Sequence, residues 1–380
     1  MIYLDNAATS LYKPEAVAEA VFRALHSVGN SGRGAHDASL QSGRIMLQTR
    51  SLLSELFKVG DPSRVVFTSN ATESLNIAIL GLLQPGDHCI TSAMEHNSVL
   101  RPLYLLESLG LELTILPISE KGCMDLAEIE KAIKPNTKAI VVTHASNVTG
   151  NVNDIDGIGE LCKKNNLRLI LDASQTAGIL PIDMKKMNLA ALCCSGHKGL
   201  MGPQGTGVLA LGEGVMPVVQ KTGGTGVDSF SHTMPTELPE ALEAGTQNIH
   251  GLAGLLEACK YNKEYGQEKI YQKSMLLART FIRGVKALPG VTLYGDYEAA
   301  LRVPVVALNL RDIASGELSD ELFTRFGIAT RAGVHCAPLL HEDYHTAGQG
   351  MVRFSFSHFN SEQEVEKAIT ALRLLEEEYR

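Results

Sequence analysis

The chain has 380 residues, of which 44% are hydrophobic and 20% are charged, and its formal net charge is -8. This composition is typical of a globular protein and argues against a disordered or fibrous one. The length suggests two domains. Because the balance is acidic and Lys and Arg do not cluster, nucleic-acid binding is not expected.

The ends and the cysteines suggest a cytoplasmic protein without a membrane segment. The opening MIYLDNAATS lacks the basic, apolar and small-residue series of a signal peptide. No run reaches the roughly 18 apolar residues that span a bilayer. The seven cysteines are an odd number without framework spacing, which fits free thiols in a reducing cytosol.

Short buried strands alternate with helices between about residues 45 and 211. Strands are predicted at 64–69, 87–93, 111–118, 138–145, 167–174 and 191–197, with helices between them such as 124–134 and 155–166. The alternation predicts an α/β fold whose sheet is mostly parallel and covered by helices on both faces. Ligands bind at the carboxyl ends of such strands, so functional residues are expected there.

The second part of the chain changes character. The glycine-rich stretch 221–248 has no clear periodicity and is long for a connection, so we expect it to be functional or at an interface. A long helix is predicted at 249–266. Strands near 291–295, 304–310 and 351–357 and a closing amphipathic helix at 362–379 predict a smaller α+β domain. The predicted domains are therefore 1–252 and 253–380.

Two charged residues follow neighbouring predicted strands. Asp172 ends the strand 167–174, and a buried carboxylate there must be paired, although by itself it could simply cap a helix. Lys198 follows the next strand in SGHKGLMGPQGTGVL, where removal from water would lower its pKa and make it nucleophilic. Such a pair suits pyridoxal phosphate (PLP): the lysine forms the Schiff base, and the carboxylate pairs with the pyridine nitrogen.

Other strand ends carry polar residues that are individually weak signals. SNATESLN (69–76) leads into a helix whose free N–H groups suit a phosphate, although Asn70 or Thr72 could be a simple cap. His96 could stack on a flat ring or be an ordinary polar residue, and Asn147 is weak alone. The joint order of phosphate loop, histidine, asparagine, Asp-x-x-Gln and Ser-x-His-Lys-Gly is improbable by chance.

The stretch RAGVHCAPLLHEDYH (331–345) places Cys336 among three histidines. It could hold a metal, surround a nucleophilic thiol or be a polar loop. Because it lacks a Cys-x-x-Cys pair and the usual zinc spacing, no metal is expected. His341 and His345 are expected to be polar residues of an exposed segment, whereas His335 is a candidate to tune the thiol. Cys193 and Cys194, on a predicted strand, are expected to be small core residues.

Through these motifs taken together, the sequence resembles the class V, fold type I PLP enzymes, and within them the cysteine desulfurase and selenocysteine lyase family. The resemblance spans nearly the whole chain and is carried by YLDNAATS, RGAH (33–36), ATESLN, EHNS, SNVTG, DASQ, SGHKGLMGPQGTGVL, EAGTQN, RAGVHCAP and MVRFSFSHFN. The compact cysteine segment is similar to the type II (SUF-type) branch. The family fold implies a large domain with a mostly parallel seven-stranded sheet and a smaller α+β C-terminal domain.

The resemblance implies a cofactor site. Lys198 would hold PLP as the internal aldimine and later move the substrate Cα proton, and Asp172 would pair with the pyridine nitrogen. Gln175 would contact the ring hydroxyl, and His96 would stack on the ring and act in proton transfer. The phosphate would be bound by Thr72, Ser195 and His197. Thr246 would reach the phosphate across a dimer interface, which implies a homodimer.

The resemblance also implies a substrate site and a reaction. Arg353 and Asn147 would hold the substrate carboxylate, with His36 near the entrance and Arg331 close to the thiol and the substrate. PLP acts as an electron sink, Cys336 attacks the sulfur of L-cysteine or L-selenocysteine, and alanine leaves behind a persulfide. The sulfur would then pass to an unidentified acceptor protein, for the assembly of iron–sulfur clusters, thiolated nucleosides or a cofactor.

Alternatives remain open at this point. Another class V reaction could use the same fold, such as a selenocysteine lyase, C–S lyase, aminotransferase, kynureninase-like hydrolase or epimerase. A non-catalytic scaffold is also conceivable, although Lys198, Asp172 and His96 argue against it. Two departures from the family pattern stand out: the segment before EAGT looks shortened, and Asn70 and Ala71 replace a more usual Gly-Thr pair.

Overall fold

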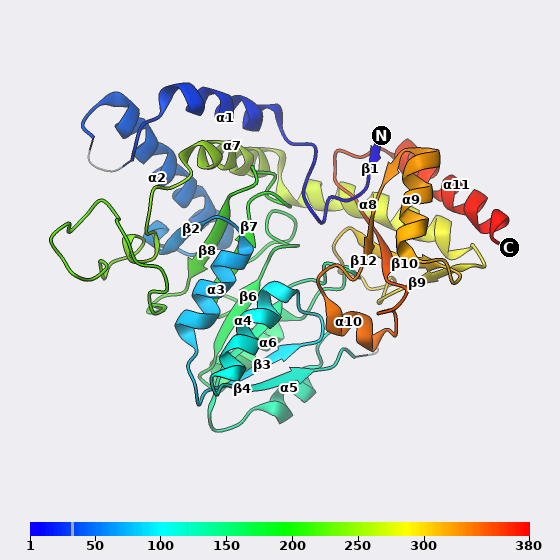
Figure 1. Ribbon diagram of the computed structural model, residues 1–380, viewed down its shortest axis with the longest axis horizontal. Helices are drawn as coiled ribbons and strands as arrows, with labels where there is room; N and C mark the ends of the chain where they lie inside the picture. The colour runs from blue at the N-terminus through cyan, green and yellow to red at the C-terminus, as the bar shows by residue number, and fades with distance from the viewer. Residues whose placement is uncertain (32–33, 120) are drawn as a thin grey trace.

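The computed structural model spans residues 1–380 and describes residues 1–31, 34–119 and 121–380 (Figure 1). Arg33 of the RGAH motif lies outside the described residues. A large sheet with its helices forms one part of the molecule, and a smaller sheet with the C-terminal helix forms the other.

The large sheet has seven strands in the order β2-β8-β7-β6-β5-β3-β4. β8 pairs antiparallel with β2 and with β7, and the other pairs are parallel, so the predicted mostly parallel seven-stranded sheet is confirmed. The strands are β2 (Val65–Thr68), β3 (His88–Ser92), β4 (Glu112–Leu116), β5 (Thr137–Thr143), β6 (Arg168–Asp172), β7 (Leu189–Ser195) and β8 (Gly207–Leu211).

Helices cover both faces of this sheet because its strands are apolar on both sides. Leu169 and Leu171 of β6 face a core shared with α2, α6 and α7, whereas Ile170 faces a core shared with α3 and α4. Cys193 and Cys194 are fully buried, one in each core, as predicted. The helices are α1 (Glu15–Ser27), α2 (Asp37–Phe57), α3 (Ala71–Leu82), α4 (Asn97–Ser108), α5 (Leu126–Ala132), α6 (Ile155–Lys164) and α7 (Ile249–Tyr265).

The smaller part is built on an antiparallel sheet in the order β12-β13-β10-β9. Phe281 of α8 packs on Phe354 of β13, with ring centroids 4.6 Å apart. The strands are β9 (Val291–Leu293), β10 (Val305–Leu310), β12 (Arg331–Gly333) and β13 (Met351–Ser355); β1 (Ile2–Tyr3) pairs separately with β11 (Ile328–Ala329). The helices are α8 (Gln267–Lys286), α9 (Ser315–Phe326), α10 (Pro338–Asp343) and α11 (Glu362–Glu378).

The consecutive helices α7 and α8 contribute to different hydrophobic cores, one in the large part and one in the small part. Leu252 and Leu255 of α7 pack in the large core, whereas Leu277 of α8 packs in the small one. Gly266, with a φ of 95°, separates the two helices. Leu4, near the N-terminus, also packs in the small core. The chain therefore starts in the smaller part, and the limit at residue 252, which falls inside α7, stays a prediction.

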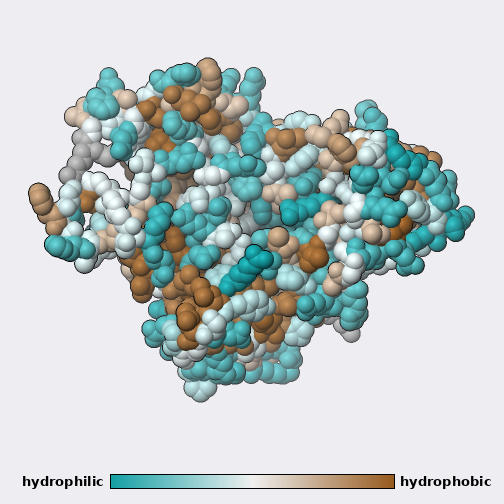
Figure 2. All heavy atoms as spheres, viewed as in Figure 1, coloured by the Kyte–Doolittle hydropathy of each residue, from teal (hydrophilic) through white to brown (hydrophobic). Residues whose placement is uncertain are grey.

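Residues 221–248 extend away from the large part (green, at the left of Figure 1) and contain only the short 3₁₀ turn η2 (Glu240–Leu242) as a helix. Another 3₁₀ turn, η1 (Pro62–Arg64), precedes β2. Phe230 of the extended segment is 100% exposed. Apolar surface also gathers over α1 (Figure 2), where Phe22 and Leu25 are exposed. Exposed apolar groups of this kind are typical of interaction surfaces.

None of the helices in the described part of the chain combines the length and the apolar character that crossing a bilayer requires.

Candidate active site

A cavity of about 170 Å³ lies at the carboxyl ends of β5, β6 and β7. Thr143, Asp172 and Ser195 are the last residues of those three strands and line it. Parallel strands end at one edge of a sheet, which is why residues far apart in sequence meet here. The remaining lining residues are Asn70, Ala71, Thr72, His96, Ser98, Asn147, Ser174, Gln175, His197 and Lys198.

Asp172 is held as an acceptor at the base of this cavity. Asp172 is only 4% exposed. Its Oδ1 accepts hydrogen bonds from the backbone N and the Oγ of Ser174, at 2.9 and 2.5 Å. Donors of this kind stabilise the charged carboxylate. Ser174 was not predicted as a site residue, although an Asp followed two residues later by Ser is the spacing that forms such a local turn.

Lys198 follows β7 and lines the same cavity as Asp172. Its pKa is lowered to about 8, chiefly by removal from water and also by the nearby guanidinium groups of Arg353 and Arg331, against the opposing effect of Asp172. A lysine with this pKa carries a sizeable neutral fraction near pH 7, which makes it a nucleophile and a base.

The N-terminus of α3 opens onto the cavity. Asn70 caps this helix by accepting a hydrogen bond from the backbone N of Glu73 at 2.9 Å, so the capping interpretation of Asn70 is confirmed. Ser195 Oγ accepts from the backbone N of Ala71, at 3.1 Å, and the hydroxyls of Thr72 and Ser98 lie 2.8 Å apart. Hydroxyls and a helix N-terminus together form a phosphate-binding environment.

Two neutral imidazoles complete the cavity wall. His96 caps α4, because its Nδ1 accepts from the backbone N of Ser98 at 3.0 Å, and burial lowers its pKa. His197 Nδ1 lies 3.0 Å from Thr9 Oγ1, and burial lowers the pKa of His197 to about 4. An uncharged, flat imidazole such as His96 can lie against an aromatic ring without an electrostatic penalty.

Cys336 lies on a short segment between β12 and α10 that is anchored to the cavity. The backbone N of Asn97 donates to Cys336 O at 2.7 Å, and Asn147 Nδ2 donates to His335 O at 2.9 Å. His335 and Cys336 both have positive φ, 54° and 58°, a conformation that costs non-glycine residues about 1–3 kcal/mol each. The thiol itself is exposed.

The three histidines near Cys336 lie in different environments, and one of them contradicts the prediction. His335 is 4% exposed, and its Nε2 lies 3.1 Å from Arg331 O, so one ring nitrogen is hydrogen-bonded to the backbone. His341 is fully buried in α10, with Nδ1 2.9 Å from Thr346 Oγ1. The prediction that His341 is exposed is wrong, because α10 turns that side chain into the core and stacks it on His335. His345 is exposed, as predicted.

No group of three or more His, Cys, Asp or Glu side chains that could hold a metal ion occurs within the described ranges.

Several predicted site residues lie outside the cavity lining. Arg353 is almost fully buried and donates to Asn147 O at 3.0 Å, and Arg331 faces it across the β12–β13 pair. His36 is exposed and caps α2. Thr246 is exposed. Asn147 lines the cavity, but its side-chain amide is bonded to His335 O.

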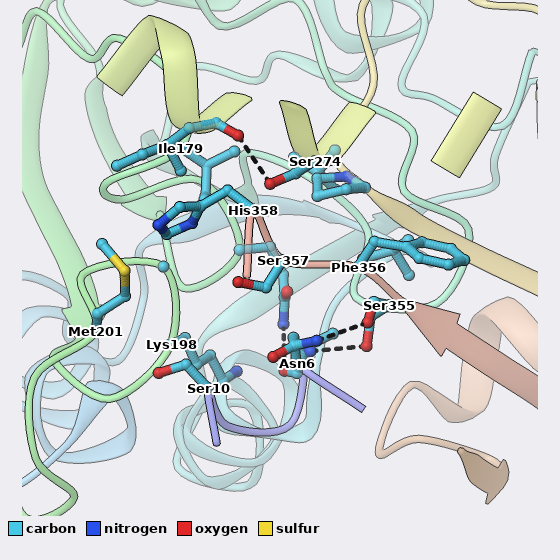
Figure 3. Close-up of a pocket in the computed structure, with 17 residues that line it drawn as sticks. Asn6, Ser10, Ile179, Lys198, Met201, Ser274, Ser355, Phe356, Ser357 and His358 are labelled. Carbon is cyan, nitrogen blue, oxygen red and sulfur yellow. Dashed lines mark hydrogen bonds between the residues drawn. The ribbon is translucent and has the colours of Figure 1, made fainter. Parts of the chain in front are cut away.

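A second, smaller cavity of about 50 Å³ lies on another side of Lys198 (Figure 3). Lys198 and Gln175 line both cavities. The other walls come from the N-terminal segment, from α8 and from the end of β13, with Ser10, Ser274 and His358 among them (Figure 3). Lys198 therefore lies where the large part, the small part and the N-terminal segment meet.

The donor set of the larger cavity fits PLP. The lysine with its lowered pKa, the carboxylate with one oxygen fixed by Ser174, and the hydroxyls at the α3 N-terminus match the aldehyde, the pyridine nitrogen and the phosphate, respectively.

The sequence is similar to a known protein family and to members of it. The family model described as Aminotransferase class-V matches residues 2–368. A "Probable cysteine desulfurase" of Pyrococcus abyssi is 34% identical, over 99% of this chain and 94% of that protein. A "Cysteine desulfurase IscS" of Vibrio campbellii is 32% identical, over 98% of this chain and 92% of that protein.

A solved structure gives the same result for the fold. The apo structure of a cysteine desulfurase from Thermococcus onnurineus NA1 superposes with a TM-score of 0.91 at 32% identity, covering 99% of this chain and 95% of the other. The similarity runs through both parts of the molecule and includes the segments that carry Lys198 and Cys336. The chain therefore belongs to the class V aminotransferase family, and within it to the cysteine desulfurases.

Proposed function

We propose that this chain binds PLP in the cavity of about 170 Å³ and converts L-cysteine to L-alanine, leaving the sulfur on Cys336 as a persulfide. One observation carries the proposal. Hydrogen bonds from Asn97 and Asn147 attach the segment 335–336 to the cavity that contains Lys198 and Asp172. A thiol is thereby held beside a site suited to PLP, an arrangement that a simple aminotransferase does not need.

Specific residues would hold the cofactor. Lys198 would form the covalent link, Asp172 would pair with the pyridine nitrogen through the oxygen that Ser174 leaves free, and Gln175 would contact the ring hydroxyl. The phosphate would be bound by Thr72, Ser195 and His197, with His96 against the ring. When bound there, PLP supplies an electron sink that makes the Cα proton of an amino acid removable.

The chain's own residues would then bind the substrate and move its proton. The guanidinium groups of Arg353 and Arg331 attract the α-carboxylate, since a planar fork suits two carboxylate oxygens. Asn147 and His36 would lie along the same approach. Lys198 Nζ would take the proton from Cα, because its lowered pKa leaves a neutral fraction to act as the base.

Sulfur transfer would take place at the exposed thiol of Cys336. The Cys336 thiolate attacks the substrate sulfur, forming an S–S bond while the Cβ–S bond breaks. The electron pair of that bond stays with the three-carbon fragment, which takes up a proton and leaves as alanine. Arg331, on the preceding strand, provides positive charge near the thiolate.

The test is a comparison of the wild type with Cys336→Ala and with Cys123→Ala, the other cysteine that is not fully buried. Each protein is incubated with L-cysteine and a reductant, and alanine and sulfide are measured. We expect Cys336→Ala to lose at least about 100-fold of the activity and Cys123→Ala to retain it. Full activity in Cys336→Ala would rule out the persulfide step.

We also propose a homodimer that passes its sulfur to an acceptor protein, as in the type II branch. The exposed position of Thr246, outside its own cavity, and the fully exposed Phe230 on the segment 221–248 support a shared site. The exposed thiol on a short anchored segment supports delivery to another protein. Light scattering tests the dimer, and PLP retention in Thr246→Val tests the shared site; a monomer with full PLP retention would contradict both.

The same assay with L-selenocysteine in place of L-cysteine measures the substrate preference. Selenide release that exceeds sulfide release many-fold would favour the selenocysteine lyase alternative.

A further inference from the structure

The N-terminal motif YLDNAATS, residues 3–10, is fixed to Ser355 at the end of β13 by four hydrogen bonds, one of them from Ser355 Oγ to Leu4 O at 3.2 Å. Leu4 O accepts from Ser355 N at 2.7 Å, Asn6 Nδ2 donates to Ser355 O at 2.9 Å, and Ala7 N donates to Ser355 Oγ at 2.9 Å. Figure 3 shows Asn6 and Ser355 facing each other in the region of Lys198. The two chain neighbours of Asp5, Leu4 and Asn6, are therefore both hydrogen-bonded to Ser355.

The carboxylate of Asp5 pairs with Arg353, two residues before Ser355 on the same strand. Asp5 Oδ1 lies 2.8 Å from Arg353 Nη2, and the two side chains are 20% and 2% exposed, respectively. In the described part of the chain, Asp5 is the one carboxylate within ion-pair distance of Arg353. The second fixed contact is the hydrogen bond from Arg353 Nη1 to Asn147 O.

Positive charge is concentrated around this pair. Arg331 is directly opposite Arg353 in the antiparallel β12–β13 pair, an unfavourable position for like charges. Lys198 is also close enough to sense both guanidinium groups. Among the described residues, Asp5 is the counter-ion of Arg353 and no carboxylate lies within ion-pair distance of Arg331, so an anionic substrate group can balance the excess charge of the two arginines.

Attraction alone does not orient a substrate. A carboxylate is received by two parallel N–H groups only if the plane of the guanidinium is fixed, and a free arginine has many rotamers. Asp5 and Asn147 O together fix that plane from two directions. The motif YLDNAATS thus has a physical reason to carry an acid at its third position.

We infer that Asp5 is a positioning residue for substrate binding: it holds the Arg353 guanidinium in the orientation that receives the α-carboxylate of an amino-acid substrate. The inference deepens the proposed function and rests on it for the substrate class. It concerns the carboxylate that all α-amino acids share, and not the sulfur chemistry.

The test compares Asp5→Ala and Asp5→Asn in the PLP-loaded enzyme. We expect Asp5→Ala to raise the KM for L-cysteine at least about 10-fold while kcat changes less than about 3-fold, because orientation is lost but the chemistry is not. Asp5→Asn keeps a hydrogen-bond acceptor and should stay within about 3-fold of the wild type. Glu15→Ala, an exposed acid in the first turn of α1, is the matched control.

A second measurement separates positioning from general damage. L-Alanine, which has no sulfur, is titrated into each variant, and its binding is followed by the absorbance of the bound cofactor. We expect Asp5→Ala to weaken L-alanine binding about 10-fold, and to have no further effect in an Arg353→Ala background. Unchanged L-alanine binding, or an equal loss in both backgrounds, would overturn the role of Asp5.

The two proposals fail in different ways. If the wild type forms no alanine from L-cysteine, the proposed function is wrong, whereas the L-alanine titration still tests Asp5. If the wild type is active but Asp5→Ala has the wild-type KM and the wild-type affinity for L-alanine, only the inference about Asp5 is wrong.

Discussion

The side-chain amide of Asn147 donates a hydrogen bond to the backbone carbonyl oxygen of His335, 188 residues away, at 2.9 Å. Asn147 follows β5 of the large sheet, and His335 directly precedes Cys336. The backbone oxygen of Asn147 also accepts from Arg353. One residue therefore connects the cavity of about 170 Å³, Arg353 and the segment that carries Cys336.

Removing that amide should slow sulfur transfer. In Asn147→Ala the backbone oxygen of His335 loses its side-chain donor while the bond from Asn97 N to Cys336 O remains, so the strained left-handed conformation of the segment 335–336 is less well held. We expect the rate of persulfide formation to fall at least about 10-fold, measured in single turnover by mass spectrometry. Asn147→Asp should be at least as slow, because it sets an oxygen against the carbonyl oxygen. A wild-type rate in both variants would show that the bond is dispensable.

Replacing Ser174 should remove one of the hydrogen bonds that hold the Asp172 carboxylate in the cavity wall. Ser174→Ala removes the 2.5 Å hydrogen bond from Oγ to Asp172 but keeps the backbone donor. Hydrogen bonds to charged groups contribute about 1.5–3 kcal/mol, so we expect kcat to fall about 10-fold or more with PLP still bound. Thr176→Val, which removes a nearby hydroxyl that bonds only to a backbone carbonyl, is the control and should stay near wild type.

Capture of PLP should depend on pH through Lys198. Its pKa of about 8 means that the neutral, nucleophilic amine increases as pH rises through 8, so uptake of PLP by the PLP-free protein should speed up and then level off. The visible absorbance of lysine-bound PLP gives the rate. Lys198→Ala should form no such band, whereas Lys186→Ala, at an exposed lysine, should behave as wild type. A rise only above about pH 10 would indicate an ordinary lysine.

Glu95, beside His96, should make stability depend on pH. It is fully buried, Ser92 Oγ donates to its Oε1 at 2.5 Å, and burial raises the pKa of Glu95 from 4.5 to about 8. Between these values the folded protein keeps a proton that the unfolded chain has lost. Its contribution to stability is therefore present in full below pH 4.5 and is lost as pH rises through 8.

Glu95→Gln removes this titration. Relative to Glu95→Gln, we expect the wild type to lose unfolding free energy, on the order of 3 kcal/mol, as pH rises from about 5 to 8. Urea unfolding at several pH values provides the measurement. Glu107→Gln, at an exposed position of α4, should track the wild type throughout. A constant difference between wild type and Glu95→Gln would mean that Glu95 is ionised in the folded protein.

Local patterns in the sequence determined six of the seven strands of the large sheet and several of the cavity residues that follow them. Buried β-branched runs and the alternation with helices predict β2 to β7, because a parallel sheet covered on both faces needs strands that are apolar on both sides. Strand ends then predict where Asp172, Lys198 and His96 lie, since parallel strands end at one edge. Cys336 was recognised from its motif, not from a pattern of its own.

Only the tertiary structure decided what each side chain contacts. The pairing of Asp5 with Arg353 joins residues 348 positions apart, and no local pattern encodes it. His341 was expected in solvent, but it is fully buried in α10, where its ring stacks on that of His335. The bond from Asn147 to His335 O, 188 positions away, arises in the same way. Secondary structure follows from short-range preferences, whereas burial and hydrogen-bond partners depend on which distant segments fold together.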